Sequence, residues 1–179
     1  MFLRSLRRGF GSDERGVSAV EFALIAPMMI GLYLGCVEVS DGVSADRKVS
    51  LTAAALANLT AQVATISTAD MTNIFDASSA IIAPYSASKL KVTVTCIAID
   101  ANNVARVKWS QTRNGTAKSG TITIPTALAV ASTQLILAEA SYDYTPTVGY
   151  NITGTLTLSD KMYMSPRITA PVYNSTACT

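Results

Sequence analysis

The fold is decided by a short stretch near the N-terminus, Arg15-Gly16-Val17-Ser18-Ala19-Val20-Glu21-Phe22, and by the apolar run that it opens. The run continues to Val37, and Glu21 is its single charged residue. At ~1.5 Å of rise per residue such a helix is about 31 Å long, which matches the ~30 Å hydrocarbon core of a bilayer. We therefore expect residues 17–37 to form a transmembrane helix.

Glu21 is the unusual residue of this run. A carboxylate costs on the order of 2.5–3.5 kcal/mol at the centre of a bilayer, and less near the interface. Ionisable groups inside a membrane span are by default functional and have a partner that compensates their charge. An ordinary uncleaved anchor would leave Glu21 without a role.

All of the net positive charge precedes the apolar run. The first sixteen residues contain two carboxylates and four arginines, whereas from Val17 onward ten basic residues are matched by ten acidic ones. The arginines are Arg4, Arg7, Arg8 and Arg15. Basic residues beside a spanning helix favour a cytoplasmic N-terminus and leave the C-terminal bulk outside. No aromatic interleaving and no second basic stripe follow, so we expect no nucleic-acid partner.

Three interpretations of this N-terminus are open. A secretory signal peptide has an apolar region of about 7–15 residues and then a small-residue cleavage site. Here the run is longer, and the nearest small-residue site, Ser44-Ala45, is poor. The second interpretation is a plain uncleaved anchor. The third is a processed N-terminus, and it uses both Gly16 and Glu21.

The residues around Gly16 resemble the processing site of type IV prepilins, and specifically that of the TadE-like pseudopilins of tight-adherence (Tad/Flp) pilus systems. The shared features are a short basic leader, a glycine followed by small and apolar residues, and a glutamate at the fifth place, here Glu21. The resemblance implies that a prepilin peptidase cuts between Gly16 and Val17 on the cytoplasmic side. It also implies that Glu21 is an assembly contact, which pairs with the new ammonium group at Val17 of a neighbouring subunit and sets register.

Later segments also look like this family, more loosely. They are Val107-Lys108-Trp109-Ser110, Glu139-Ala140-Ser141-Tyr142-Asp143-Tyr144-Thr145-Pro146 and Met164-Ser165-Pro166-Arg167. The major fibre subunit of such systems is a very short pilin, so a chain of 179 residues fits a minor or tip-associated pseudopilin better. The implied partners are the membrane, a prepilin peptidase, other pilins or pseudopilins, and the Tad assembly machinery.

The apolar run contains features of helix packing. Pro27 frees one carbonyl and is expected to bend the helix, which neighbouring helices tolerate. Gly31 and Gly35 have GxxxG spacing, which allows a second helix to approach closely.

The same helix is expected to continue through residues 38–66. Its apolar positions recur with helical spacing, as in a helix that packs one side against a domain. They are Val39, Val43, Val49, Leu56, Leu59, Val63 and Ile66. The alternative is a break at Gly42 followed by a separate core helix, although one glycine costs only ~1 kcal/mol in a helix.

Residues 67–179 are expected to form the outer, periplasmic domain. Ser67 or Thr68 caps a second helix that Pro84 closes. β-branched alternating segments then predict strands. The expected strands are Leu90–Ile99, Val104–Trp109 and Leu135–Tyr144, with a last hairpin made by Thr155–Leu158 and Lys161–Met164. The predicted fold is α+β: residues 1–16 form a leader, and the long membrane-spanning helix continues into a pilin-like domain with an antiparallel sheet.

The cysteines bear on the compartment. If the bulk of the chain is exported, Cys96 and Cys178 can form a disulfide that ties the tail to the sheet. The alternative is two unpaired thiols, because sequence does not give the geometry.

Catalytic chemistry is not indicated. The sequence has no histidine, which removes the commonest general base and the commonest transition-metal ligand. It has no phosphate-binding loop, no GxSxG and no CxxC motif. We expect no enzyme, no cofactor, no metal and no small-molecule substrate. The predicted function is that of a minor pseudopilin at a bacterial inner membrane. The alternative is an extracytoplasmic binding or adhesin domain on an uncleaved anchor.

Overall fold

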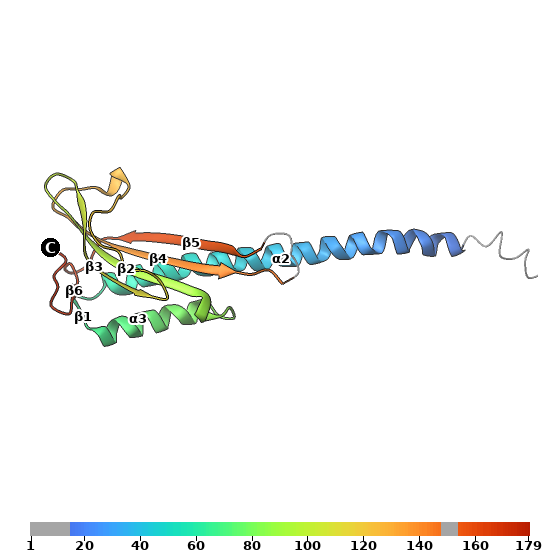
Figure 1. Cartoon of the computed structure of the whole chain (residues 1–179), viewed down its shortest axis with the longest axis horizontal. Helices are drawn as coiled ribbons and strands as arrows, with labels where there is room; N and C mark the ends of the chain where they lie inside the picture. Colours follow the sequence, from blue (N-terminus) through green and yellow to red (C-terminus); the bar gives the residue numbers. More distant parts are fainter. Residues whose placement is uncertain (1–14, 148–153) are drawn as a thin grey trace, which may run out of the picture.

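The computed structural model describes residues 15–147 and 154–179. A long N-terminal helix forms a rod, and one half of it packs against a sheet domain (Figure 1). The elements follow one another as α2 (Arg15–Ala61), β1 (Thr65–Ile66), α3 (Thr68–Ile81), η1 (Ala87–Lys89), β2 (Leu90–Ile99), β3 (Ala105–Arg113), η2 (Thr126–Leu128), β4 (Gln134–Tyr144), β5 (Leu156–Met164) and β6 (Val172–Tyr173). The predicted α+β class, with a long N-terminal helix and an antiparallel sheet, is confirmed.

Helix α2 is continuous over 47 residues and passes through both Pro27 and Gly42. The alternative of a break at Gly42 is therefore wrong. A Cβ at Gly42 would lie 3.7 Å from the ring of Tyr144, so the helix and the sheet domain approach each other closely here. At ~1.5 Å per residue α2 is about 70 Å long, more than twice the thickness of a bilayer core.

The helix ends at Ala61, four to five residues earlier than the periodicity predicts. The C-terminal segment of the chain takes over at this point: the Arg167 N–H donates to the carbonyl of Ala61 at 2.9 Å. Residues 65–66 leave the helix and become β1, which pairs in parallel with β6. A long-range strand pairing thus overrides the local helical pattern.

The main sheet has the strand order β3-β2-β4-β5 and is antiparallel throughout. Strands β2 and β4 match their predicted ranges to within one residue, whereas β3 continues four residues beyond the predicted end at Trp109, to Arg113. The predicted last hairpin is wrong, because Leu156–Met164 is one unbroken edge strand. Its register against β4 has no shift, and Asp160, at the expected turn, lies opposite Ala140. The partner strand therefore extends a segment whose own sequence indicates a turn.

Both helices cover the same face of the sheet (Figure 1). Alternating residues of β2 and β4, such as Val92, Val94 and Ala138, pack against the buried face of α2. That face is formed by Ala45, Val49, Ala53, Leu56, Ala57 and Ala61, each at most 1% exposed. The opposite sheet face is polar at one end, where the hydroxyls of Thr93 and Thr112 form a hydrogen bond of 3.0 Å. At the other end it carries a second hydrophobic cluster, formed by Ile97, Ile99, Ala105, Ile124, Leu135 and Leu137.

Helix α3 begins with a complete capping box. The Asp70 N–H donates to Ser67 Oγ at 3.2 Å, and the Ser67 N–H donates to Asp70 Oδ2 at 3.0 Å. This arrangement satisfies two of the amide groups that a helix start leaves unpaired. The predicted second helix is confirmed, and of its two candidate caps, Ser67 and Thr68, the structure uses Ser67.

Candidate functional site

Helix α2 has two halves that differ in their surroundings. Between Val17 and Val37 its large apolar side chains are exposed, whereas Ala45 and Val49 are fully buried. Figure 1 shows the first half projecting beyond the sheet domain. The exposed side chains are Val17, Val20, Phe22, Leu24, Ile25, Met28, Met29, Ile30, Leu32, Tyr33, Leu34 and Val37. Among the described residues, α2 is one helix long and apolar enough to cross a membrane, and a single-pass anchor follows.

The residues at the start of this helix are open to their surroundings. Gly16 and Val17 lie in its first turn, and no atom would contact a Cβ at Gly16 within 4 Å. Glu21 is exposed and makes no ion pair with another described residue. Val17 and Glu21 are four residues apart and share one face of the helix. The structure thus leaves the carboxylate available to another molecule.

Pro27, Gly31 and Gly35 all lie in the exposed half. The helix continues on both sides of Pro27. A Cβ at Gly31 or at Gly35 would contact nothing within 4 Å, so neither glycine is required by packing within the described residues. Close approach of another helix stays a prediction for these two positions.

Residues 16–58 match the family model described as TadE-like protein. The chain has a TadE-like N-terminal region. The resemblance drawn from the sequence is confirmed over these residues, which include Glu21 in the exposed half and Leu56 in the packed half. Comparison with curated proteins and with solved structures gives no match. The match lies within helix α2 and includes none of the strands.

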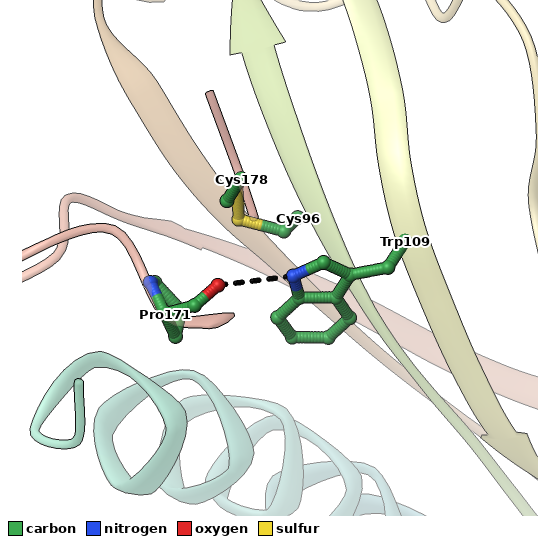
Figure 2. Close-up of a disulfide and its surroundings, with 4 residues drawn as sticks. All are labelled: Cys96, Trp109, Pro171 and Cys178. Atoms are coloured by element: carbon green, nitrogen blue, oxygen red, sulfur yellow. Dashed lines mark hydrogen bonds between the residues drawn. A yellow bond between two sulfur atoms is a disulfide. The ribbon is translucent and has the colours of Figure 1, made fainter. Parts of the chain in front are cut away.

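A disulfide ties the C-terminus to the domain that supports the TadE-like helix. Cys178 is joined to Cys96 of β2, with a Cα–Cα distance of 6.0 Å, and both residues are fully buried. Beside the bridge, the Trp109 indole Nε1–H donates to the Pro171 carbonyl at 3.0 Å (Figure 2). The ring of Tyr173 packs on the Trp109 ring at a centroid distance of 5.6 Å. The last segment of the chain is therefore a strap held by covalent, polar and aromatic contacts.

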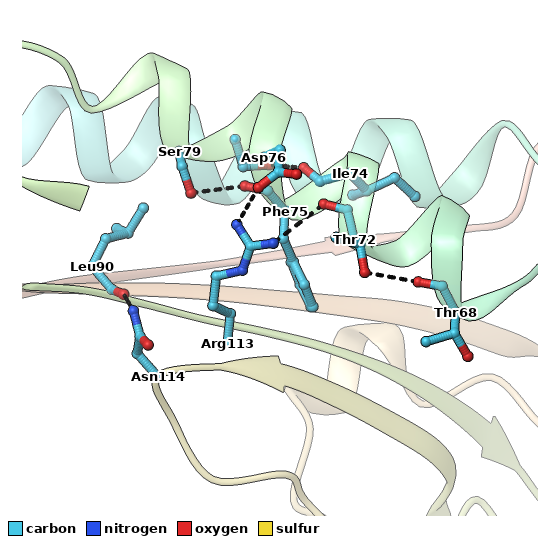
Figure 3. A network of polar contacts seen from close by, with 10 residues as sticks. Thr68, Thr72, Ile74, Phe75, Asp76, Ser79, Leu90, Arg113 and Asn114 are labelled. Carbon is cyan, nitrogen blue, oxygen red and sulfur yellow. Dashed lines mark hydrogen bonds and ion pairs between the residues drawn. The ribbon is translucent and has the colours of Figure 1, made fainter. Parts of the chain in front are cut away.

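A second set of contacts joins α3 to the edge strand β3. Arg113 Nη1 donates to Asp76 Oδ1 at 2.6 Å, and Nη2 donates to the carbonyl of Thr72 at 3.4 Å (Figure 3). The guanidinium also lies over the ring of Phe75, 5.5 Å from its centroid. The residue therefore contributes a charge pair and a cation–π contact at one helix–sheet junction.

Three carboxylates of the residues that follow α2 have structural partners. The side chain of Ser67 lowers the pKa of Asp70 by its hydrogen bond. The hydrogen bond from Lys91, at 2.7 Å, lowers the pKa of Asp143. The Val104 N–H lowers the pKa of Asp100. Within residues 15–147 and 154–179, no group of three or more His, Cys, Asp or Glu side chains could hold a metal ion.

Sequence reasoning missed a groove where α2 leaves the sheet domain. The hollow has a volume of about 380 Å³. Its lining residues are Glu38, Val39, Gly42, Val43, Asp46, Tyr144, Pro146, Leu156 and Leu158. Val39 and Val43 belong to the predicted apolar pattern, but they are 67% and 47% exposed instead of packed. The periodicity of α2 marks these positions as apolar without showing that the sheet stops short of covering them.

Proposed function

We propose that this chain is a minor pseudopilin of a Tad pilus system, processed by a prepilin peptidase between Gly16 and Val17. The observation that carries the proposal is the TadE-like match, which begins at Gly16 and extends into the packed half of α2. Removal of residues 1–16 takes away the net positive charge and creates a new amino terminus at Val17. The mature chain then joins, primes or caps a pilus.

The proposed orientation has the N-terminus in the cytoplasm and the sheet domain in the periplasm, with α2 in the inner membrane. The four arginines before the span support it, because basic residues accumulate on the cytoplasmic side. The bridge between Cys96 and Cys178 agrees with this orientation, since disulfides persist in oxidising compartments such as the periplasm. After assembly the domain would be outside the cell.

Glu21 is proposed as the assembly contact. Its carboxylate has no partner among the described residues and lies in a helix surface suited to lipid. The ammonium group at Val17 of a neighbouring subunit would supply the opposite charge. A pair of this kind adds little net stability, but removal of one member leaves a buried charge uncompensated at a cost of about 3–5 kcal/mol. The pair therefore selects the register in which subunits meet.

The proposal is tested by processing and by incorporation into sheared pili, both followed in the native host. We expect the precursor to become smaller in the presence of the prepilin peptidase and the mature form to appear in the pilus fraction. Gly16→Val should block both steps, because a branched side chain replaces the glycine at the cut. The matched control is Gly11→Val in the leader, which should be processed normally.

Either of two results would contradict this function. One is a precursor of unchanged size whether or not the peptidase is present, with the chain still in the membrane; this outcome favours the tethered binding domain. The other is efficient processing with no trace of the chain in pili or in the assembly complex at the membrane.

A further inference from the structure

An apolar stripe runs along α2 from the membrane segment into the groove. Its members are Leu32, Cys36, Val39 and Val43, at intervals of four, three and four residues. This spacing places them on one side of a helix. Leu32, Val39 and Val43 are 63%, 67% and 47% exposed, and Cys36 is an exposed free thiol. The stripe is therefore uncovered in a single copy of the chain.

The C-terminal end of the stripe lies beyond the apolar run of residues 17–37. Val39 and Val43 follow Val37 by two and six residues, about 3 Å and 9 Å along the helix axis. There they form one wall of the groove, and Leu156 and Leu158 of β5 form another. Leu156 is itself 44% exposed. Lipid tails do not reach far beyond residues 17–37, so they do not cover Val39 and Val43. Burial of these apolar side chains away from water therefore needs a protein surface.

Two opposite charges flank the stripe where it ends. At ~100° per residue, Asp46 and Arg47 lie about 50° to either side of the centre of the stripe. Both side chains are exposed, and within the part of the chain that the structure describes neither forms an ion pair. A partner that covers the stripe would thus meet a carboxylate on one side and a guanidinium on the other.

We propose that the stripe is the interface of a parallel dimer, in which α2 of a second copy lies against Cys36, Val39 and Val43 and enters the groove. Copies of one chain share one orientation in the membrane, so the same residues meet at the same height. A two-fold axis parallel to the helices then brings Asp46 of each copy opposite Arg47 of the other. In a two-fold dimer the same surface patch of both copies forms the interface, so it must be complementary to itself. Asp46 and Arg47 make the patch complementary to itself in charge. The dimer needs the membrane anchor but neither leader removal nor pilus assembly.

The native thiol provides the test. Membranes containing the full-length chain are oxidised with copper phenanthroline and analysed without reductant. We expect a Cys36–Cys36 cross-link that doubles the mass of the chain, because two such residues face each other across the axis and come within disulfide reach. The bridge between Cys96 and Cys178 is buried and does not take part.

Two variants that place the thiol elsewhere on the helix serve as a positive and a negative control. In a Cys36→Ser background, Val39→Cys should restore the cross-link, whereas Val37→Cys, on the far side of the helix, should give none. Equal yields at positions 36 and 37 would indicate random collision and overturn the proposal. A cross-link only to a protein of another mass, or none at positions 36 and 39, would also overturn it, because another protein or lipid would then cover the stripe.

A charge exchange tests the same geometry independently. Arg47→Asp places carboxylates opposite one another and should lower the Cys36 cross-link yield by about fivefold, the effect of a pair worth ~1 kcal/mol. Asp46→Arg combined with Arg47→Asp recreates the opposite charges and should restore the yield. If the single variant has the native yield, or the double variant is no better than the single one, the proposed two-fold pairing is wrong. Unchanged Trp109 fluorescence confirms that these variants are folded.

Discussion

Trp109 of β3 donates its indole N–H to the carbonyl of Pro171, a residue 62 positions later in the chain, across 3.0 Å. Both residues are buried, so this bond has no competition from water. It fixes the C-terminal strap beside the disulfide and helps to keep Cys178, 82 residues after Cys96, in the core. Trp109 is also the single tryptophan, so its fluorescence reports on the strap.

The first prediction concerns the disulfide. Cys178→Ser opens a loop whose ends are 82 residues apart in sequence. We expect the free energy of unfolding to fall by about 2–5 kcal/mol, because the unfolded chain regains loop entropy and the buried site loses its covalent contact. Trp109 fluorescence during urea unfolding in detergent measures the change. Cys36→Ser is the control and should leave the midpoint unchanged; an unchanged midpoint for Cys178→Ser would show that the strap does not stabilise the domain.

The second prediction concerns the junction of α3 and β3. Arg113→Lys keeps the positive charge but loses the two-nitrogen contact with Asp76 and Thr72 and the planar group over Phe75. We expect a loss of about 1 kcal/mol in the free energy of unfolding. Arg106→Lys is the matched control, because the Arg106 side chain is 60% exposed and lies 3.7 Å from Asp100. This substitution should leave the free energy of unfolding almost unchanged. Equal effects of the two substitutions would refute the assigned role of Arg113.

The third prediction is an acid-sensitive cap on α3. The hydrogen bonds from Ser67 lower the pKa of Asp70 below 3.8, so the folded state favours the ionised form. The stabilisation of the folded state by the ionised Asp70 is therefore complete at neutral pH. It is lost as the pH falls through the folded-state pKa of Asp70. NMR titration of Asp70 should show a higher pKa in Ser67→Ala than in the native chain. An identical titration in both proteins would show that the capping box does not hold the charge.

These particulars show what local sequence can and cannot predict. Leu90–Ile99 is recognisable because β-branched residues alternate there, and α3 because a capping residue, Ser67 or Thr68, stands at its start. Each signal is contained within a few neighbouring residues. The anchor with Glu21 is equally local, since length and hydropathy alone mark it.

The missed features depend on distant segments. The edge strand β5 is extended by its pairing with β4, against the turn chemistry of Ser159 and Asp160. The end of α2 at Ala61 is set by Arg167 and β6. The groove exists because the sheet ends beside Gly42, where α2 continues alone towards the membrane. No window of local sequence contains both partners of any of these contacts.

The fourth prediction separates processing from assembly at Glu21. Glu21→Gln preserves shape but removes the negative charge, so the proposed ammonium partner stays unpaired. We expect normal leader removal and a decrease of about tenfold or more in incorporation into pili, because a buried unpaired charge costs well over 1.4 kcal/mol. Glu21→Asp, which keeps the charge, should retain part of the incorporation. Native incorporation of Glu21→Gln would exclude the charge pair.

We infer that the mature anchor begins at a cut between Gly16 and Val17. The most direct measurement is the N-terminal residue and intact mass of the protein purified from the membranes or pili of its native host. We expect a chain that starts at Val17, with Cys96 and Cys178 oxidised. A chain that still carries Arg4, Arg7 and Arg8 would contradict it.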